Sequence, residues 1–221
     1  MIKTVKKIIS YIMVCVLFLS MCIPCEAAQT STATASDANA TTGFPQITST
    51  SAIIMDAQSG QIIYEKNSHT RQYPASITKI MTAYLAIKNG DLNSTITMSD
   101  AAVWGIDRNS SHIALDVGEE ISMSDALYAV MLMSANEAAW AIAEQVSGSL
   151  ENFVQLMNDT AQSLGCKDTH FTNANGLHDP DHYTTAYDLY LIFNECLKYD
   201  LFKDAIHQAH YTAVFTRNGQ E

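Results

Sequence analysis

The order of the apolar patterns along the chain restricts the folds that it can adopt. Short β-rich runs come first, at residues 51–55 and 61–64, and residues 56–60 between them have the polar and glycine chemistry of a tight turn. They predict a β-hairpin, and segments with helical periodicity dominate the middle of the chain. No repeat with a period of about 20 to 50 residues is present, which excludes solenoids and propellers.

Most of the predicted helices carry a start or stop signal. A helix from Ser76 to about residue 87 ends at Asn89-Gly90, and Ser122-x-x-Asp125 is a capping box that opens a helix to about residue 133. The other predicted helices are residues 137–146, residues 150–164 closed by Gly165, and residues 186–198 capped by Thr184 or Thr185.

Loops and a late strand complete the expected architecture. Residues 91–118 are predicted to be rich in loops, and residues 211–215 predict a strand. Because strands lie near both ends and helices lie between them, we expect the ends to pair in one sheet covered by helices. The expected fold class is α+β, an antiparallel sheet with a helical cluster.

The first 27 residues have the layout of a secretory signal peptide. Lys3, Lys6 and Lys7 form a basic head, an apolar run covers residues 8–23, and small residues stand at −3 and −1 of a cleavage site after Ala27. An uncleaved membrane anchor is the alternative, since the run approaches the roughly 17 residues that span a bilayer. A lipoprotein signal is disfavoured because the bulky Met21 precedes its cysteine.

The composition indicates a packed domain rather than a disordered chain. Apolar residues make up 48% of the sequence and charged residues 16%. Residues 28–48, rich in Ser, Thr and Ala, predict a linker, and residues 49–221 predict the domain. The net charge of −11, with no cationic cluster after the basic head, argues against nucleic acid and against anionic lipid as partners.

Two cysteines remain once the signal peptide is removed. Cys166 and Cys196 lie in otherwise apolar-periodic segments, so we expect two buried thiols. A disulfide between them is the alternative, which spacing alone does not decide.

Ser76-Ile77-Thr78-Lys79 is an S-x-x-K element at a predicted helix start. Residues three apart share a helix face, so the lysine nitrogen can reach the hydroxyl. Serine is a poor nucleophile until a base takes its proton, and lysine serves as that base only when burial or a neighbouring cation lowers its pKa. Helix-start N–H groups would suit a developing oxyanion. The alternative is a capping serine followed by a solvated lysine.

Ser134-Ala135-Asn136 is a second candidate element, placed between two predicted helices. A break between helices can direct both polar side chains into a cleft, where Ser134 could relay a proton and Asn136 could hold a substrate amide. The alternative is that Ser134 caps the helix that begins at Glu137. The S-x-N follows the S-x-x-K by 58 residues.

These motifs and their flanks resemble the serine D-alanyl-D-alanine carboxypeptidases of the peptidase S11 type. These low-molecular-mass penicillin-binding proteins share their catalytic fold with class A β-lactamases. The similarity covers roughly residues 51–215. The segments that carry it are residues 51–56, 60–65, 71–83, 134–139, 175–177 and 182–189.

The resemblance implies roles for four side chains. Ser76 would be the acyl-enzyme nucleophile, Lys79 its general base, and Ser134 a second catalytic hydroxyl that passes a proton toward the leaving D-alanine. Asn136 would bind the substrate's backbone amide. The implied reaction is hydrolysis of the D-Ala-D-Ala bond that ends a peptidoglycan stem peptide. This chemistry needs neither metal nor organic cofactor. The resemblance also implies that β-lactams are covalent inhibitors and that the enzyme acts at the periplasmic or extracellular face of the cell wall.

The chain departs from the family in one respect. The family's third element, Lys-Thr-Gly on a strand that lines the cleft, is absent. The cations after Ser134 stand in other contexts; they are Lys167, Lys198, Lys203 and Arg217. We therefore expect a sequence truncated at its C-terminal strands, with an unpaired sheet edge and without one oxyanion donor.

Two alternatives to the carboxypeptidase remain open. A β-lactamase-like hydrolase would use the same Ser-Lys pair, although Ala135 stands where class A β-lactamases usually have Asp. A degenerate, noncatalytic wall-binding fragment would explain the missing third element, whereas the intact Ser76, Lys79, Ser134 and Asn136 argue against it.

Other polar and apolar clusters are expected to be structural. Residues 178–182, His-Asp-Pro-Asp-His, and the pair His207 and His210 lack a third ligand at a recognisable spacing, so a solvated loop is favoured over a metal site. Methionines and a tyrosine at helical spacing predict ordinary core; they are Met123, Tyr128, Met131 and Met133.

The missing third element leads to a prediction for residues 28–221 expressed alone. We expect this fragment to aggregate and to react poorly with penicillin, because losing one oxyanion donor typically costs about 10²- to 10³-fold. The measurement is a time course of penicillin labelling and D-alanine release, beside a version that contains the third element. A monomeric fragment that matches the longer protein in both assays would contradict the expectation.

Overall fold

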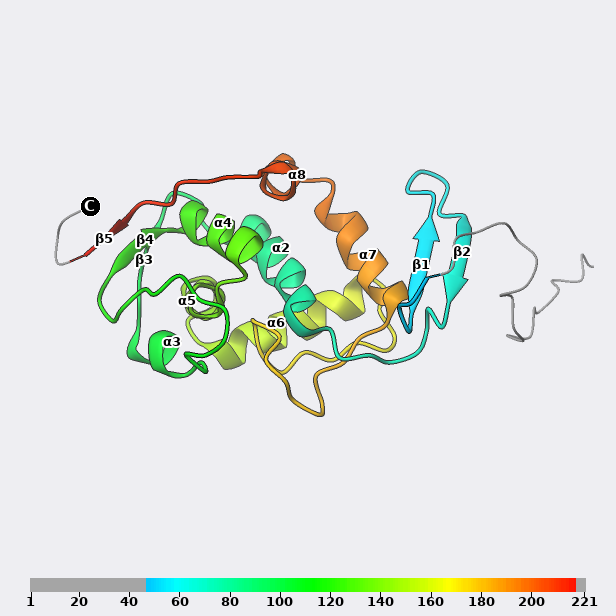
Figure 1. The fold of residues 1–221 in the computed structure, drawn as a ribbon, viewed down its shortest axis with the longest axis horizontal. Helices are drawn as coiled ribbons and strands as arrows, with labels where there is room; N and C mark the ends of the chain where they lie inside the picture. Colours follow the sequence, from blue (N-terminus) through cyan, green and yellow to red (C-terminus); the bar gives the residue numbers. More distant parts are fainter. Residues whose placement is uncertain (1–46, 218–221) are drawn as a thin grey trace, which may run out of the picture. The chain divides into compact units, whose positions relative to one another are not determined.

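The described region, residues 47–217 of the computed structural model, begins with a β-hairpin (Figure 1). Strand β1 (Ala52–Met55) pairs antiparallel with β2 (Ile62–Lys66). In the turn, the Asp56 carboxylate accepts the backbone N–H of Ser59 at 2.6 Å. The predicted hairpin is confirmed. The predicted signal peptide and almost all of the predicted linker lie outside the described residues.

Helices make up about half of the described chain after the hairpin, most of them close to where the sequence predicts them. They are the 3-10 helix η1 (Ala75–Thr78) and the α-helices α2 (Lys79–Asn89), α3 (Asp100–Trp104), α4 (Met123–Met133), α5 (Asn136–Ser147), α6 (Leu150–Ser163), α7 (Ala186–Cys196) and α8 (Asp200–His207). Ser122 caps α4 as predicted, by accepting the N–H of Asp125 at 2.9 Å. Of the two candidate caps of α7, Thr185 accepts the N–H of Asp188 at 3.0 Å.

The predicted loop over residues 91–118 is only partly right. It contains β3 (Thr95–Thr97) and the short helix α3, which begins where the Ser99 hydroxyl accepts the N–H of Ala102 at 2.9 Å. A single serine cap before five residues is too local a signal for periodicity to detect. Helix α8 was likewise not predicted.

The expected single sheet that joins the two ends of the chain is wrong. Within the described residues the hairpin forms one sheet, and β3, β4 (Glu120–Ser122) and β5 (Phe215–Thr216) form another, in that order. The predicted strand over residues 211–215 is observed only as the short β5, because Tyr211 packs against α4 and not in the sheet. Its ring stacks on Tyr128 of α4 at 3.8 Å between centroids, and its hydroxyl donates to Asp125 at 2.8 Å. The segment before β5 therefore crosses α4 (Figure 1).

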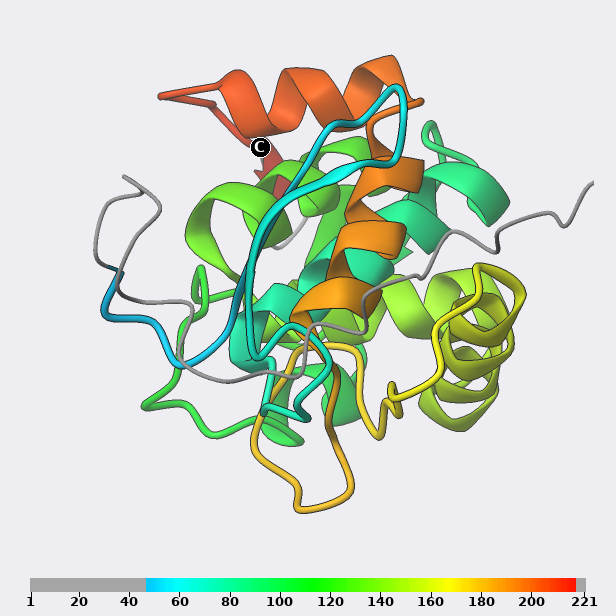
Figure 2. The same cartoon turned by 90° about the vertical axis from the view of Figure 1, so that its right-hand side faces the viewer.

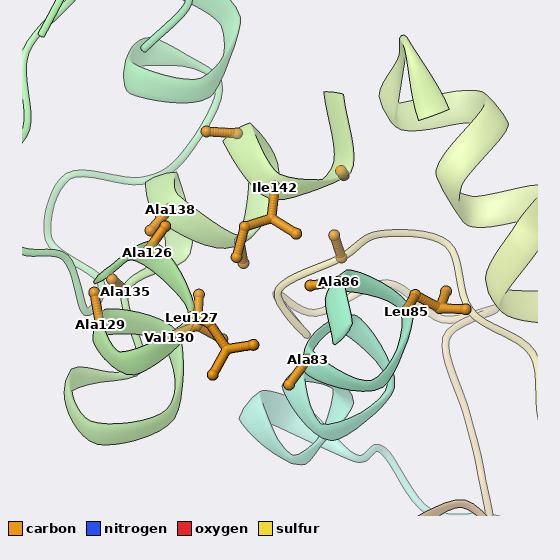
Figure 3. Packing of buried hydrophobic residues seen from close by; sticks show 14 of the residues in the cluster. Ala83, Leu85, Ala86, Ala126, Leu127, Ala129, Val130, Ala135, Ala138 and Ile142 are labelled. Carbon is orange, nitrogen blue, oxygen red and sulfur yellow. The ribbon is translucent and has the colours of Figure 1, made fainter. Parts of the chain in front are cut away.

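Helix α2 is the centre of the core. It packs against α4, α5, α6, α7 and α8, and both views place α7 beside it (Figure 2). Small side chains line the meeting faces of α2, α4 and α5, with larger ones such as Leu127 and Ile142 filling the space between (Figure 3). The small residues that the close-up labels are Ala83, Ala86, Ala126, Ala129, Ala135 and Ala138. Because alanine leaves room, these helix backbones approach closely, and the resulting architecture confirms the α+β fold class with antiparallel sheets.

The predicted core methionines divide between inside and outside. Met123 and Tyr128 are buried and Met131 is half-buried, but the side chain of Met133 is 60% exposed, so its assignment to the core was wrong. Met133 is the last residue of α4, where the helix face turns away from the core. Cys166 and Cys196 are free thiols; Cys196 is buried as predicted, and Cys166 is half-buried.

The described residues from Thr48 onward form one compact unit. No helix within residues 47–217 has the length and apolar character needed to cross a bilayer.

The packing of α5 leads to a stability prediction. Ile142 is fully buried, so Ile142→Ala should remove about 2–5 kcal/mol from the free energy of unfolding. The matched control is Ile62→Ala on the exposed face of the hairpin, where the loss should stay below about 1 kcal/mol. Urea unfolding followed by circular dichroism measures both, and equal losses would contradict the placement of α5 in the core.

Candidate active site

The S-x-x-K element spans the junction of a 3-10 turn and an α-helix. Ser76 lies in η1 and is exposed, whereas Lys79 is the first residue of α2 and only 3% exposed. The Lys79 Nζ lies 3.3 Å from the Ser76 Oγ, as the spacing predicts. Ala75, just before the serine, has a positive φ of 49°, a left-handed conformation that costs free energy for a residue with a Cβ. The predicted pairing is therefore present, although the serine precedes the α-helix.

The Lys79 ammonium is held by acceptors from three parts of the fold. Besides the Ser76 hydroxyl, it donates to the Asn136 Oδ1 at 2.6 Å and to the backbone carbonyl of Asn175 at 2.6 Å. Burial lowers the pKa of Lys79 to about 8, and the negative charge of Glu137 opposes this lowering. At any given pH a larger fraction of Lys79 is therefore neutral than of an exposed lysine.

Ser134 lies at the end of α4 with a left-handed backbone, φ 55° and ψ 35°. Its Oγ is buried and has no hydrogen-bond partner among the described residues. The alternative that Ser134 caps α5 is wrong, because the N-cap position is Ala135 and no side chain caps that helix. The hydroxyl therefore remains able to donate and to accept.

Asn136 opens α5 and is oriented by a loop that the sequence did not single out. Its Nδ2 donates to the Ser110 Oγ at 2.8 Å, and Ser110 in turn donates to the backbone carbonyl of Asp107. The backbone N–H of Asn136 donates to the carbonyl of Ser111 at 3.0 Å. Because Nδ2 is committed to Ser110, the Oδ1 faces Lys79. No motif in the sequence identifies Ser110, which lies in the predicted loop.

The segment from Asn173 to Leu177 packs directly against the nucleophile's turn. Gly176 has a φ of +83°, and a Cβ there would lie 1.9 Å from the carbonyl oxygen of Ala75. The Asn173 Oδ1 accepts the N–H of Gly176 at 2.6 Å and so fixes the loop. Only glycine allows this approach, which delivers the Asn175 carbonyl to Lys79. The backbone contact had no signature beyond the Asn-Gly dipeptide itself.

His182 also stabilises the turn that carries the nucleophile, through a hydrogen bond to Thr78. Its Nδ1 accepts the N–H of Thr172 at 3.0 Å, so the proton is on Nε2, which donates to the Thr78 Oγ1 at 2.8 Å. Burial lowers the pKa of His182 to about 4. The prediction of a solvated loop is wrong for this residue, which is 2% exposed, whereas His178 is half-buried. No cluster of His, Cys, Asp and Glu within residues 47–217 is arranged to hold a metal ion.

Comparison with known proteins assigns a family to this arrangement. Residues 36–220 match the family described as D-alanyl-D-alanine carboxypeptidase. The chain is 42% identical over 156 residues to the D-alanyl-D-alanine carboxypeptidase DacA of Haemophilus influenzae, covering 67% of this chain and 39% of the relative. It is 40% identical over 153 residues to DacF of Bacillus subtilis, covering 68% and 39%.

Solved structures agree with this assignment. Penicillin binding protein 5 from Haemophilus influenzae superposes with a TM-score of 0.67 at 37% identity, over 72% of this chain and 47% of that one. A Streptomyces DD-transpeptidase superposes with a TM-score of 0.75 at 28% identity, over 80% and 71%. The chain spans about two fifths of the length of the first curated relatives that it matches. By its sequence and its fold, it belongs to the D-alanyl-D-alanine carboxypeptidase family.

Proposed function

We propose that the chain carries the acylation centre of a serine-type D-Ala-D-Ala carboxypeptidase. The observation that carries the proposal is the buried Lys79 with its Nζ 3.3 Å from the exposed Ser76 hydroxyl. An exposed nucleophile beside a desolvated amine is the arrangement that general-base activation requires.

The proposed reaction proceeds through a serine ester. Neutral Lys79 takes the proton of the Ser76 hydroxyl as the Oγ attacks the carbonyl carbon of the penultimate D-alanine. The C–N bond to the terminal D-alanine then breaks, and the leaving nitrogen receives a proton by way of the Ser134 hydroxyl. Water hydrolyses the ester and restores the serine. Ser134 suits this relay because its buried Oγ has no hydrogen-bond partner among residues 47–217.

Asn136 would bind the substrate amide through its carbonyl oxygen. Its Nδ2 is occupied by Ser110, whereas the Oδ1, which already accepts from Lys79, has a second lone pair for an amide N–H of the stem peptide. This role is therefore compatible with the observed orientation.

The β-lactamase alternative is less well supported. Fast deacylation in that class uses a water activated by a carboxylate. Within the described residues, the hydrogen-bond partners of Lys79 are Ser76, Asn136 and the backbone carbonyl of Asn175, and none of them is a carboxylate. The noncatalytic alternative is opposed by the complete Ser76–Lys79–Asn136 network.

The proposed substrate and location follow from the same chemistry. The substrate is a peptidoglycan stem peptide that ends in D-Ala-D-Ala, and β-lactams, whose strained amide a serine can open, are the proposed covalent inhibitors. The similarity to penicillin binding protein 5 from Haemophilus influenzae supports this. We place the enzyme on the periplasmic or extracellular face of the cell wall, on the ground of the signal-peptide layout of residues 1–27.

The assignment of Ser76 as the nucleophile is tested with a fluorescent penicillin, in a version of the protein that contains the third element. Ser76→Ala should abolish covalent labelling, because Ser76 carries the hydroxyl that is hydrogen-bonded to the Lys79 Nζ. The control is Ser163→Ala at the end of α6, which should label like the wild type. Labelling of a folded Ser76→Ala protein at the wild-type rate would disprove the assignment.

The base is tested by the pH dependence of acylation. A base acts only when neutral, and lysine is neutral above its pKa, so the rate should rise with pH and reach half its plateau near pH 8. Lys79→Arg keeps the charge but cannot lose a proton, so acylation should fall by at least about 10²-fold at every pH. A near-normal rate in Lys79→Arg would reduce the lysine to an electrostatic role.

A further inference from the structure

Glu137 is a fully buried carboxylate one residue beyond Asn136, in the first turn of α5. Its Oε1 accepts the backbone N–H of Ile113 at 2.7 Å, and its Oε2 has no hydrogen-bond partner among the described residues. A buried charge with one unsatisfied oxygen is destabilising unless another charge compensates it. A single backbone N–H does not supply that compensation.

The compensating charge available to Glu137 is the ammonium of Lys79. Lys79 is itself buried, and its three acceptors are a hydroxyl, an amide oxygen and a backbone carbonyl, all neutral. No ion pair of Lys79 is present within residues 47–217. The two charges act through the buried interior, where screening is weak and a charge influences a group that it does not touch. In agreement, the carboxylate of Glu137 raises the pKa of Lys79 against the lowering caused by burial.

Within residues 47–217, the hydrogen bonds of the Lys79 Nζ go to Ser76, Asn136 and Asn175 and to no other ionisable group. His182 lies behind Thr78 and accepts the backbone N–H of Thr172, which keeps it neutral. In residues 107–114 and 173–181, the stretches that contain Ser110 and Asn175, the remaining ionisable residues are Asp107, Arg108, His112, His178, Asp179 and Asp181. None of them is hydrogen-bonded to the lysine, and Glu137 alone is both fully buried and covalently adjacent to its ligand Asn136.

We propose that Glu137 is a positioning residue for Lys79. Its buried carboxylate, one residue beyond Asn136, favours the protonated form of the lysine without touching it. The ammonium then keeps its three acceptors in place while the site is empty. Through Ile113, the same carboxylate also holds the loop that carries Ser110, which orients Asn136. The role of Lys79 as a base rests on the proposed function, but the coupling of the two charges does not.

The coupling is measured by following Lys79 directly. The side-chain resonances of the lysines are recorded by NMR as a function of pH in the isotope-labelled protein, and Lys79→Arg identifies the signal of Lys79. Glu137→Gln keeps an oxygen for the Ile113 N–H but removes the charge. We expect the titration midpoint of Lys79, near pH 8 in the wild type, to fall by roughly one pH unit.

Three further variants separate charge from packing. Glu144→Gln, two turns along the same helix, should leave the midpoint unchanged, because Glu144 bonds to Ser99 and Trp140 instead. Glu137→Asp keeps the charge while shortening the side chain, so its midpoint should stay above that of Glu137→Gln. Glu137→Met, also uncharged, repeats the test if the glutamine variant does not fold.

An unchanged Lys79 midpoint in a folded, uncharged variant overturns the inference. A midpoint in Glu137→Asp as low as that in Glu137→Gln overturns it as well. The measurement does not depend on acylation. A protein that contains the third element, fails to bind penicillin and still shows the shift refutes the proposed function and leaves this inference standing.

Discussion

The burial of a single ammonium group is the constraint on which the rest of this structure depends. Lys79 is 3% exposed, and an amine so far from water is stable only when all of its protons find acceptors. Those acceptors come from η1, from the start of α5 and from the loop at Asn175. Segments far apart in the sequence must therefore meet within hydrogen-bond distance of one nitrogen.

The helical core makes that meeting possible. Alanines line the faces where α2 approaches α4 and α5 (Figure 3). Asn136, at the N-terminus of α5, thereby bonds to Lys79, the first residue of α2. The loop at Asn175 is brought equally close because Gly176 has no side chain to separate it from Ala75. The Thr82 hydroxyl, one turn along α2, donates to the carbonyl of Ala174 at 2.6 Å and holds the loop at its other end. Packing thus places the lysine's acceptors, and the acceptors in turn permit its burial.

Sequence predicted the parts of this site that depend on short-range order. The S-x-x-K spacing, the S-x-N between two helices, the hairpin and the Ser122 and Thr185 caps all follow from periodicity or capping within a few residues. The acceptor Asn175, the orienting Ser110 and the buried His182 were not predicted as such, because each acts through a contact between distant segments. The expected sheet was wrong for a similar reason, since β5 pairs with β4 from the middle of the chain and not with the N-terminal hairpin.

Two of the four non-glycine residues with positive φ within residues 47–217 lie at the candidate site. They are Ala75 and Ser134, which flank or form the site, and each stands at a junction rather than inside a regular helix. Such conformations cost on the order of 1–3 kcal/mol each and persist only where the surroundings enforce them. The left-handed conformation of Ala75 is maintained by Gly176 and Pro74, and that of Ser134 by the immediate start of α5. Because both strained residues adjoin or carry a hydroxyl of the site, relaxing either backbone would displace that hydroxyl. The fold therefore maintains strain at the points where the proposed chemistry needs a fixed oxygen.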